Sequence, residues 1–172
     1  KLFSMTIRGR ILAGGHDLVV TGSNEIYWDI RLMPSGELDY DNVRTAEEFV
    51  EAIGGTDYAI ASDSSSWVLL KQDVYLPQDI TMTGNFSINL QGHKICSASQ
   101  NGAERLISAK EKQIIIDSQQ KGGVEANILV TGGTLQLNNN MKAGDIRVES
   151  GSLELDYVSA DAVVIDGGFA DL

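Results

Sequence analysis

Residues 128–137 read ILVTGGTLQL, residues 146–155 read IRVESGSLEL and residues 163–172 read VVIDGGFADL. Each phrase has two short stretches of alternating apolar residues joined at a glycine, and successive copies start 18 and 17 residues apart. A short strand, a glycine corner and a second strand at nearly constant spacing form one coil of a solenoid. A single coil cannot bury its apolar side chains alone, so the coils must stack. The sequence therefore predicts an all-β solenoid.

Less regular copies of the phrase extend upstream to Trp67. Residues 80–90 read ITMTGNFSINL, which has the same shape with its corner at Gly84, and the apolar pairs of residues 106–116 supply another coil. We count about five coils between Trp67 and Leu172. They give an axis of about 24 Å at the roughly 4.8 Å spacing of adjacent strands.

The composition fits a fold with many tight corners and excludes several classes of partner. The 172 residues include 18 glycines and only 2 prolines, and glycine takes positive φ without steric cost. The net charge of −11 argues against nucleic acid, because phosphates need clustered Lys and Arg, and against an anionic membrane surface. No apolar run approaches the roughly 18 residues that span a bilayer, so no membrane insertion is expected.

One helix is predicted, over residues 45–53. Thr45 and Glu48 have the spacing of a capping box, in which the Thr hydroxyl accepts from the Glu amide and the Glu side chain reaches back to the Thr amide. The pair Gly54-Gly55 ends the helix in a left-handed conformation. An amphipathic helix directly before a solenoid is expected to cover the open apolar end of the first coil.

Residues 1–43 read as strands and are open to two interpretations. Residues 26–33 alternate in polarity, a turn follows at Pro34-Ser35-Gly36, and Leu38 and Tyr40 continue the alternation in a return strand. This stretch is either a β-strand appendage or a set of irregular first coils.

The solenoid domain is assigned to residues 44–172. Leu172 closes a repeat phrase with no capping segment after it, and an uncapped solenoid end exposes strand edges. The domain is therefore expected to be truncated at its C-terminus and to belong to a longer parent chain.

Residues 67–95, WVLLKQDVYLPQDITMTGNFSINLQGHKI, resemble the opening coils of right-handed parallel β-helix domains in large bacterial cell-surface proteins. Those domains read approximately V-x-L-x-x-D-V-x-L, then a strand, then I-x-L-D-L-N-G-H-x-I. This chain has NLQGHKI in the last place, with Gln91 where Asn is usual. Residues 106–118 resemble the next coil of that family, and residues 45–53 resemble its N-terminal cap.

The resemblance implies a right-handed parallel β-helix with an N-terminal helical cap. Members of the family are mostly adhesins or structural stalks, and some related β-helices are polysaccharide lyases or hydrolases. The resemblance thus implies an extracellular or bacterial cell-surface location.

Two carboxylates are weak candidates for a metal site. Glu149 and Asp166 occupy the same position in successive phrases, where the first copy has Thr131, so stacking would place them about 4.8 Å apart. A pair of acids could cleave a glycosidic bond, and acidic oxygens could bind Ca²⁺. Asp145 and Asp161 have a less regular spacing. The default interpretation is a solvated acidic ladder that binds no cofactor. The alternative is that the ladder binds Ca²⁺.

The remaining candidates favour structural roles. His93 follows Gly92 at a predicted corner, where we expect it to bond to backbone, and Cys96 is expected to be a buried or half-buried thiol without a disulfide partner. Residues 138–140, NNN, predict a corner at which amides bridge coils. Trp28 and Trp67 are expected in the core because of their strand contexts. No set of residues is assigned as catalytic.

These features favour a non-enzymatic function. The leading hypothesis is a segment of a secreted bacterial surface protein, acting as an adhesin or stalk that meets a host glycan or an extracellular protein. The first alternative is a polysaccharide lyase or glycoside hydrolase acting on acidic polysaccharide, and the second is a scaffold without a ligand.

Overall fold

The chain divides into two compact units, Lys1–Leu38 and Asp39–Leu172. The computed structural model describes residues 42–62, 66–99 and 102–172 together with six two-residue strands of the first unit. Trp28 and the predicted turn and return strand at residues 34–40 lie outside the described residues.

The described residues of the first unit form three pairs of parallel strands. Strand β1 pairs with β4, β2 with β5 and β3 with β6, and the paired residues are 18 or 19 positions apart, as in Leu2–Val20 and Thr6–Glu25. Three strands that recur in the same order at a nearly constant offset have the arrangement of two stacked coils. The bounds are β1 Leu2–Phe3, β2 Thr6–Ile7, β3 Ile11–Leu12, β4 Val20–Thr21, β5 Glu25–Ile26 and β6 Ile30–Arg31.

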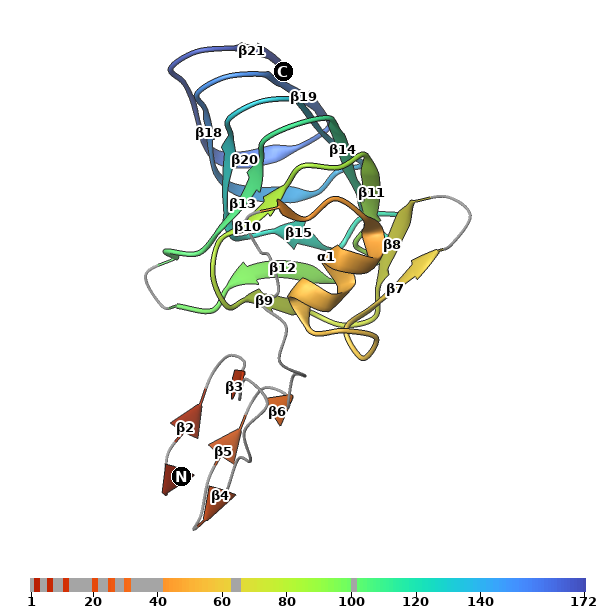
Figure 1. The fold of residues 1–172 in the computed structure, drawn as a ribbon. Coiled ribbons are helices and arrows are strands. Elements are labelled where there is room, and N and C mark those ends of the chain that lie inside the picture. The colour runs from red at the N-terminus through yellow and green to blue at the C-terminus, as the bar shows by residue number, and fades with distance from the viewer. Residues whose placement is uncertain are drawn as a thin grey trace. The chain divides into compact units, whose positions relative to one another are not determined.

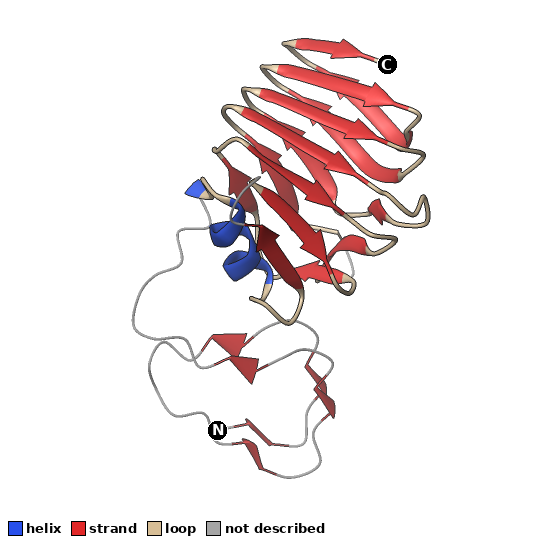
Figure 2. Ribbon diagram, turned by 90° about the vertical axis from the view of Figure 1, so that its right-hand side faces the viewer, coloured by secondary structure: helices blue, strands red, loops and turns tan. Residues whose placement is uncertain are grey.

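The second unit is a parallel β-solenoid preceded by one helix, α1 (Ala46–Ile53) (Figure 1). Its strands form a seven-stranded sheet in the order β21-β19-β17-β14-β11-β8-β7, seen in Figure 2, and an eight-stranded sheet that contains β9, β10, β12, β13, β15, β16, β18 and β20. Every pairing in the two sheets is parallel except that between β7 and β8. The bounds are β7 Ala59–Ser62, β8 Trp67–Leu70, β9 Val74–Leu76, β10 Ile80–Met82, β11 Phe86–Asn89, β12 Lys94–Ser97, β13 Arg105–Ser108, β14 Lys112–Ile116, β15 Gly123–Val124, β16 Asn127–Val130, β17 Thr134–Asn138, β18 Lys142–Val148, β19 Ser152–Asp156, β20 Ser159–Ile165 and β21 Phe169–Asp171.

The register of the seven-stranded sheet confirms the predicted solenoid of about five coils. Its strands are joined through one column of paired residues, Trp67–Ser87–Ile114–Gln136–Glu154–Asp171. The steps between these positions are 20, 27, 22, 18 and 17 residues, so the last two equal the spacing of the sequence phrases.

The coils shorten mainly because the six-residue corner between β14 and β15 (residues 117–122) becomes a three-residue corner between β17 and β18 (residues 139–141). In addition, two strands fuse into one. Strand β18 pairs with β15 through Ala143 and with β16 through Ile146, so the three residues between Val124 and Ile128 face only two residues of β18. Upstream coils therefore have three strands, whereas the last two coils, β18–β19 and β20–β21, have two.

The core is built from stacks of identical positions. Val68, Ile88, Ile115 and Leu137 are paired in successive coils of the seven-stranded sheet, and each is fully buried. Removing such apolar surface from water contributes about 25 cal/mol per Å². Because side chains alternate along a strand, Trp67 beside Val68 lies half-buried on the outer face, so its predicted core position is wrong.

Helix α1 begins as predicted but differs in one contact. The Glu48 amide donates to the Thr45 hydroxyl over 3.1 Å, which confirms the N-cap. The Glu48 carboxylate instead accepts from the amide of Arg44 at 2.6 Å, one residue before the expected Thr45 amide. The buried face of α1 includes Phe49, whose ring centroid lies 5.7 Å from the ring centroid of Phe86. The helix thus packs on the solenoid core.

The corners are held by polar side chains that bridge coils. Asn139 and Asn140 have φ of 75° and 54°, and the Asn140 amide donates to the Gln120 side chain at 3.3 Å, which confirms the predicted corner. Asp117, which is fully buried, accepts from the amides of Gly92 at 2.7 Å and Gly122 at 2.5 Å. It also accepts from the amides at positions 119 and 121. One carboxylate thus ties two coils together.

The free energy of unfolding at acidic pH is expected to depend on Asp117. Burial alone would raise the pKa of Asp117, but hydrogen bonds from backbone amides, those of Gly122 and Gly92 foremost, lower it. A lowered folded pKa stabilises the fold above the unfolded value of about 3.9, and this contribution is lost as pH falls below it. We expect Asp117→Asn to cost roughly 2 kcal/mol near neutrality. Urea unfolding at about pH 7 and about pH 3 measures the effect, and the cost should shrink at the lower pH.

Candidate functional site

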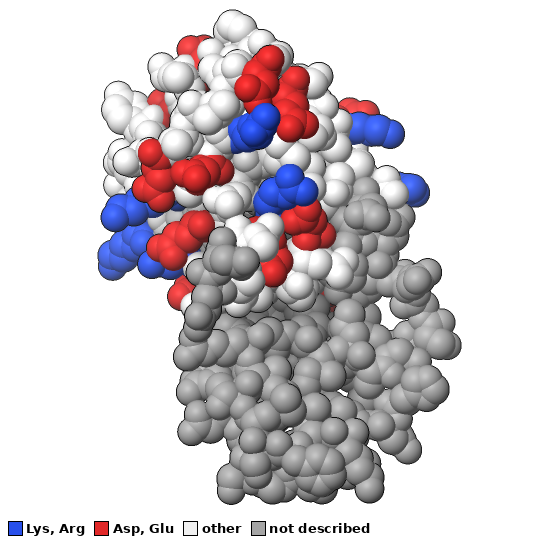
Figure 3. Space-filling model, turned by 90° about the vertical axis from the view of Figure 1, so that its left-hand side faces the viewer, with Lys and Arg blue, Asp and Glu red and all other residues white. Residues whose placement is uncertain are grey.

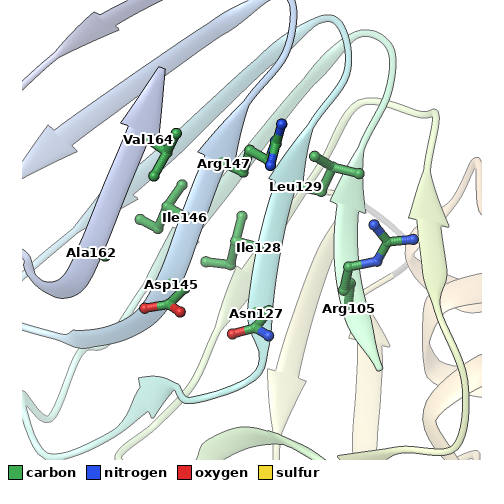
Figure 4. Close-up of a pocket in the computed structure, with 9 residues that line it drawn as sticks. All are labelled: Arg105, Asn127, Ile128, Leu129, Asp145, Ile146, Arg147, Ala162 and Val164. Atoms are coloured by element: carbon green, nitrogen blue, oxygen red, sulfur yellow. The ribbon is translucent and has the colours of Figure 1, made fainter. Parts of the chain in front are cut away.

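A lateral groove of about 260 Å³ lies on the outer face of the eight-stranded sheet (Figure 4). We define the lateral groove by the residues that line it. They come from four neighbouring strands, β13, β16, β18 and β20, and are Arg105, Asn127, Ile128, Leu129, Asp145, Ile146, Arg147, Ala162 and Val164.

The strand register explains why these residues meet. Residues at equal positions of parallel strands stack in a column, in which neighbouring residues are about 4.8 Å apart. One column runs from Arg105 through Asn127 and Asp145 to Ala162. The next outward column contains Leu129, Arg147 and Val164. Figure 4 shows these as two rows across the strands, one lined mainly by polar groups and the other containing two aliphatic side chains.

Arg105 is fixed at one end of the lateral groove by Asp79. Its Nη2 and Nε atoms donate to Asp79 Oδ2 at 2.7 and 3.1 Å, and its backbone amide donates to Oδ1 at 2.8 Å. The side-chain hydrogen bonds that Arg105 donates to Asp79 are the main cause that raises the pKa of Arg105. The guanidinium is therefore held in one orientation and its charge is compensated locally.

Glu149 and Asp166, the two candidate metal ligands, lie at successive positions of one column, as the phrases predict. Strand β18 pairs Val148 with Ile165, so the residues that follow them also stack. Arg147 lies between the two carboxylates: its Nε atom is 3.3 Å from Glu149 Oε1, and its Nη2 atom is 2.6 Å from Asp166 Oδ2. The sequence phrase did not identify this arginine as their partner.

The other two acids considered with them are not stacked. Asp145 pairs with Ala162, so Asp161 is one position out of register. Among the described residues, none forms an ion pair or a hydrogen bond with the Asp145 carboxylate, and Asp145 is exposed. It is thus an uncompensated acid in the lateral groove.

Millimolar Ca²⁺ is expected to leave the thermal unfolding midpoint of the wild-type protein unchanged, because the guanidinium of Arg147 already occupies the space between the two carboxylates. In Arg147→Gln the carboxylates face each other without a cation, and oxygen ligands of this kind suit Ca²⁺. The midpoint of the variant should rise with Ca²⁺, since a ligand of the folded state stabilises it by mass action. A scanning-calorimetry titration of both proteins measures this, and a rise in the wild type would contradict it.

A second polar cluster surrounds Cys96 on β12 and His93, the residue directly before this strand. His93 Nδ1 lies 3.7 Å from Asp73 Oδ1, while the backbone carbonyl of His93 accepts from the Gly123 amide. The side chain therefore faces an acid, and the predicted bonding to the backbone is made by the main chain of His93.

Burial, followed by the charge and hydrogen bond of Glu125, raises the pKa of the Cys96 thiol to about 12. Cys96 is 9% exposed, which confirms the predicted buried or half-buried thiol. A thiol with so high a pKa is a weak nucleophile near neutral pH. Lys94 binds the same glutamate, with Nζ 2.6 Å from Glu125 Oε1.

Within the described part of the chain, no three or more His, Cys, Asp or Glu side chains gather in a way that could hold a metal ion. No helix among the described residues is long and apolar enough to cross a membrane. Compared with protein-family models, curated proteins and solved structures, the chain matches nothing. Proposals about its function therefore rest on the geometry of the solenoid.

Proposed function

We propose that this chain is a non-enzymatic segment of a secreted bacterial surface protein, acting as an adhesin or as a structural stalk. The observation that carries the proposal is the continuous parallel pairing of both sheets through successive coils. Such stacking makes a stiff, quasi-one-dimensional body whose lateral faces are available to partners. The lateral groove lies on one of these faces.

The charged groups of the described residues support a binding or structural role. Glu149 and Asp166, which could have formed an acid pair, share the guanidinium of Arg147. Asp117 is engaged by four backbone amides. Figure 3, which views the molecule from the side opposite to Figure 2, shows acidic and basic side chains close together with uncharged surface between them. Hydrogen bonds and ion pairs that hold these acids in place favour structure over proton transfer.

The test is capture of ligands by the purified chain on an array of host glycans and extracellular matrix proteins. Saturable binding to one of them is expected of an adhesin. If no ligand is captured, the structural stalk is the function that stays compatible with the result. The enzymatic alternative is tested in parallel by the absorbance of unsaturated products and by reducing ends released from pectins and alginates, with and without Ca²⁺. Product formation above the background of heat-denatured protein would overturn the proposal.

A further inference from the structure

We propose that the lateral groove binds a lysine side chain on an extended segment of a partner protein. This inference rests on the proposed adhesin function and names the chemistry of the partner. It is carried by three features of the lateral groove: an aliphatic floor, an uncompensated carboxylate at one side of it, and guanidinium groups that are already tied to acids.

The aliphatic floor suits a methylene chain. Leu129 and Val164 lie in the same column on either side of Arg147. Val164 is 47% exposed, and Leu129 is 7% exposed. Ala162 adds a small exposed side chain beside them. Lysine characteristically lays its four methylenes along such apolar surface while the ammonium stays at the polar edge.

The charge balance of the lateral groove favours a cation. Arg105 is compensated by Asp79, and Arg147 by both Glu149 and Asp166. Asp145 adds a carboxylate that no described residue neutralises. Four acids therefore face two bases in and around the lateral groove, on a chain whose net charge is −11. This balance attracts a basic partner and disfavours an anionic one.

The shape of the polar edge favours lysine over the other candidates. An ammonium is a compact charge that a single carboxylate can satisfy, whereas a guanidinium is best bound by several acceptors in a planar, bidentate arrangement. Sugar rings stack on aromatic faces, and the lining of the lateral groove contains no aromatic residue. The partner is therefore best described as a basic polypeptide segment.

The proposal is tested by NMR titration of the ¹⁵N-labelled chain with Nα-acetyl-lysine methylamide at low salt. Saturable shift changes are expected at the amides of Leu129, Asp145 and Val164. The Nε-acetylated form of the probe keeps the stem and loses the charge, so it should cause no saturable change. Asp145→Asn should weaken binding about tenfold or more, which corresponds to about 1.4 kcal/mol.

Asp161→Asn is the matched control, because Asp161 is an exposed acid of β20 one position out of register with Asp145. It should bind the probe like the wild type. Shifts scattered over the acidic surface, equal binding of the Nε-acetylated probe, or unchanged affinity in Asp145→Asn would each overturn the proposal. Circular dichroism verifies that both variants are folded.

The array result separates this proposal from the proposed function. If an array ligand is captured equally by the wild type and Asp145→Asn, the adhesin function stands and the lysine site is refuted. If no array ligand is found while the groove-specific shifts and their loss in Asp145→Asn are observed, the lysine site stands and the adhesin function fails.

Discussion

Replacing Gly151 by alanine is expected to lower the free energy of unfolding by roughly 3 kcal/mol. Gly151 has φ of 81°, in the left-handed region, and a Cβ atom there would lie 2.6 Å from the carbonyl oxygen of Gly133 in the preceding coil. Both the backbone conformation and the close approach of the coils therefore oppose any side chain. Denaturant unfolding followed by far-ultraviolet circular dichroism measures the loss.

Gly102→Ala provides the matched control. Gly102 also has positive φ, at 65°, but among the described residues the nearest atom to a Cβ there is Asn127 Nδ2 at 3.9 Å, an ordinary contact. Only the conformational cost applies, so the expected loss is about 1 kcal/mol. Equal losses in the two variants would show that the coil-to-coil contact at Gly151 contributes nothing.

Gly151 belongs to a column of stacked glycines, and this column explains why the fold could be predicted from the sequence. Gly133, Gly151 and Gly168 stack because the coils that carry them have nearly equal lengths, and each has positive φ. Equal lengths make the phrase visible as a repeat. The earlier coils differ in length, with partners 27 residues apart between Ser87 and Ile114, because they contain a third strand and longer links. Their register could not be derived from spacing alone.

The site was only partly predictable for a related physical reason. Glu149 and Asp166 could be paired because they occupy the same position in two phrases, and the structure places them side by side. Arg147 is an outward-facing residue of β18, two positions before Glu149, which follows the strand directly, so strand alternation indicates that the two side chains share a face. The lateral groove, in contrast, combines Arg105 with Val164 across four strands. Joining them requires the register of every coil between them.

Alternation also accounts for the error at Trp67. A tryptophan in an apolar strand is expected in the core, although WVLL has no polar residue to mark which face is buried. The structure places Val68 and Leu70 inward and leaves Trp67 half-buried outside. The phase of an all-apolar strand is set by its neighbours in the sheet, here by the pairing of Val68 with the buried Ile88.

The second large effect is expected from Phe86→Ala, which should destabilise the protein by about 3–5 kcal/mol. Phe86 is 2% exposed, and its ring packs against Phe49 of α1 at a centroid distance of 5.7 Å and an interplanar angle of 47°. Truncation leaves a cavity between the helix and the first coils that neither can fill without moving. We expect the amides of α1 to lose hydrogen-exchange protection before those of β17, because the helix is held by this contact and β17 is not.

Phe169→Ala is the control for the loss of an aromatic ring, because Phe169 is 61% exposed. Its effect should stay within about 0.5 kcal/mol. A double-mutant cycle of Phe49→Ala and Phe86→Ala should show a coupling energy of about 0.5–1.5 kcal/mol. Additive losses, with uniform changes in exchange over the whole solenoid, would mean that α1 is held on the first coil by contacts other than this aromatic pair. The attachment would then rest on the remaining buried face of the helix, including Val50 and Ile53.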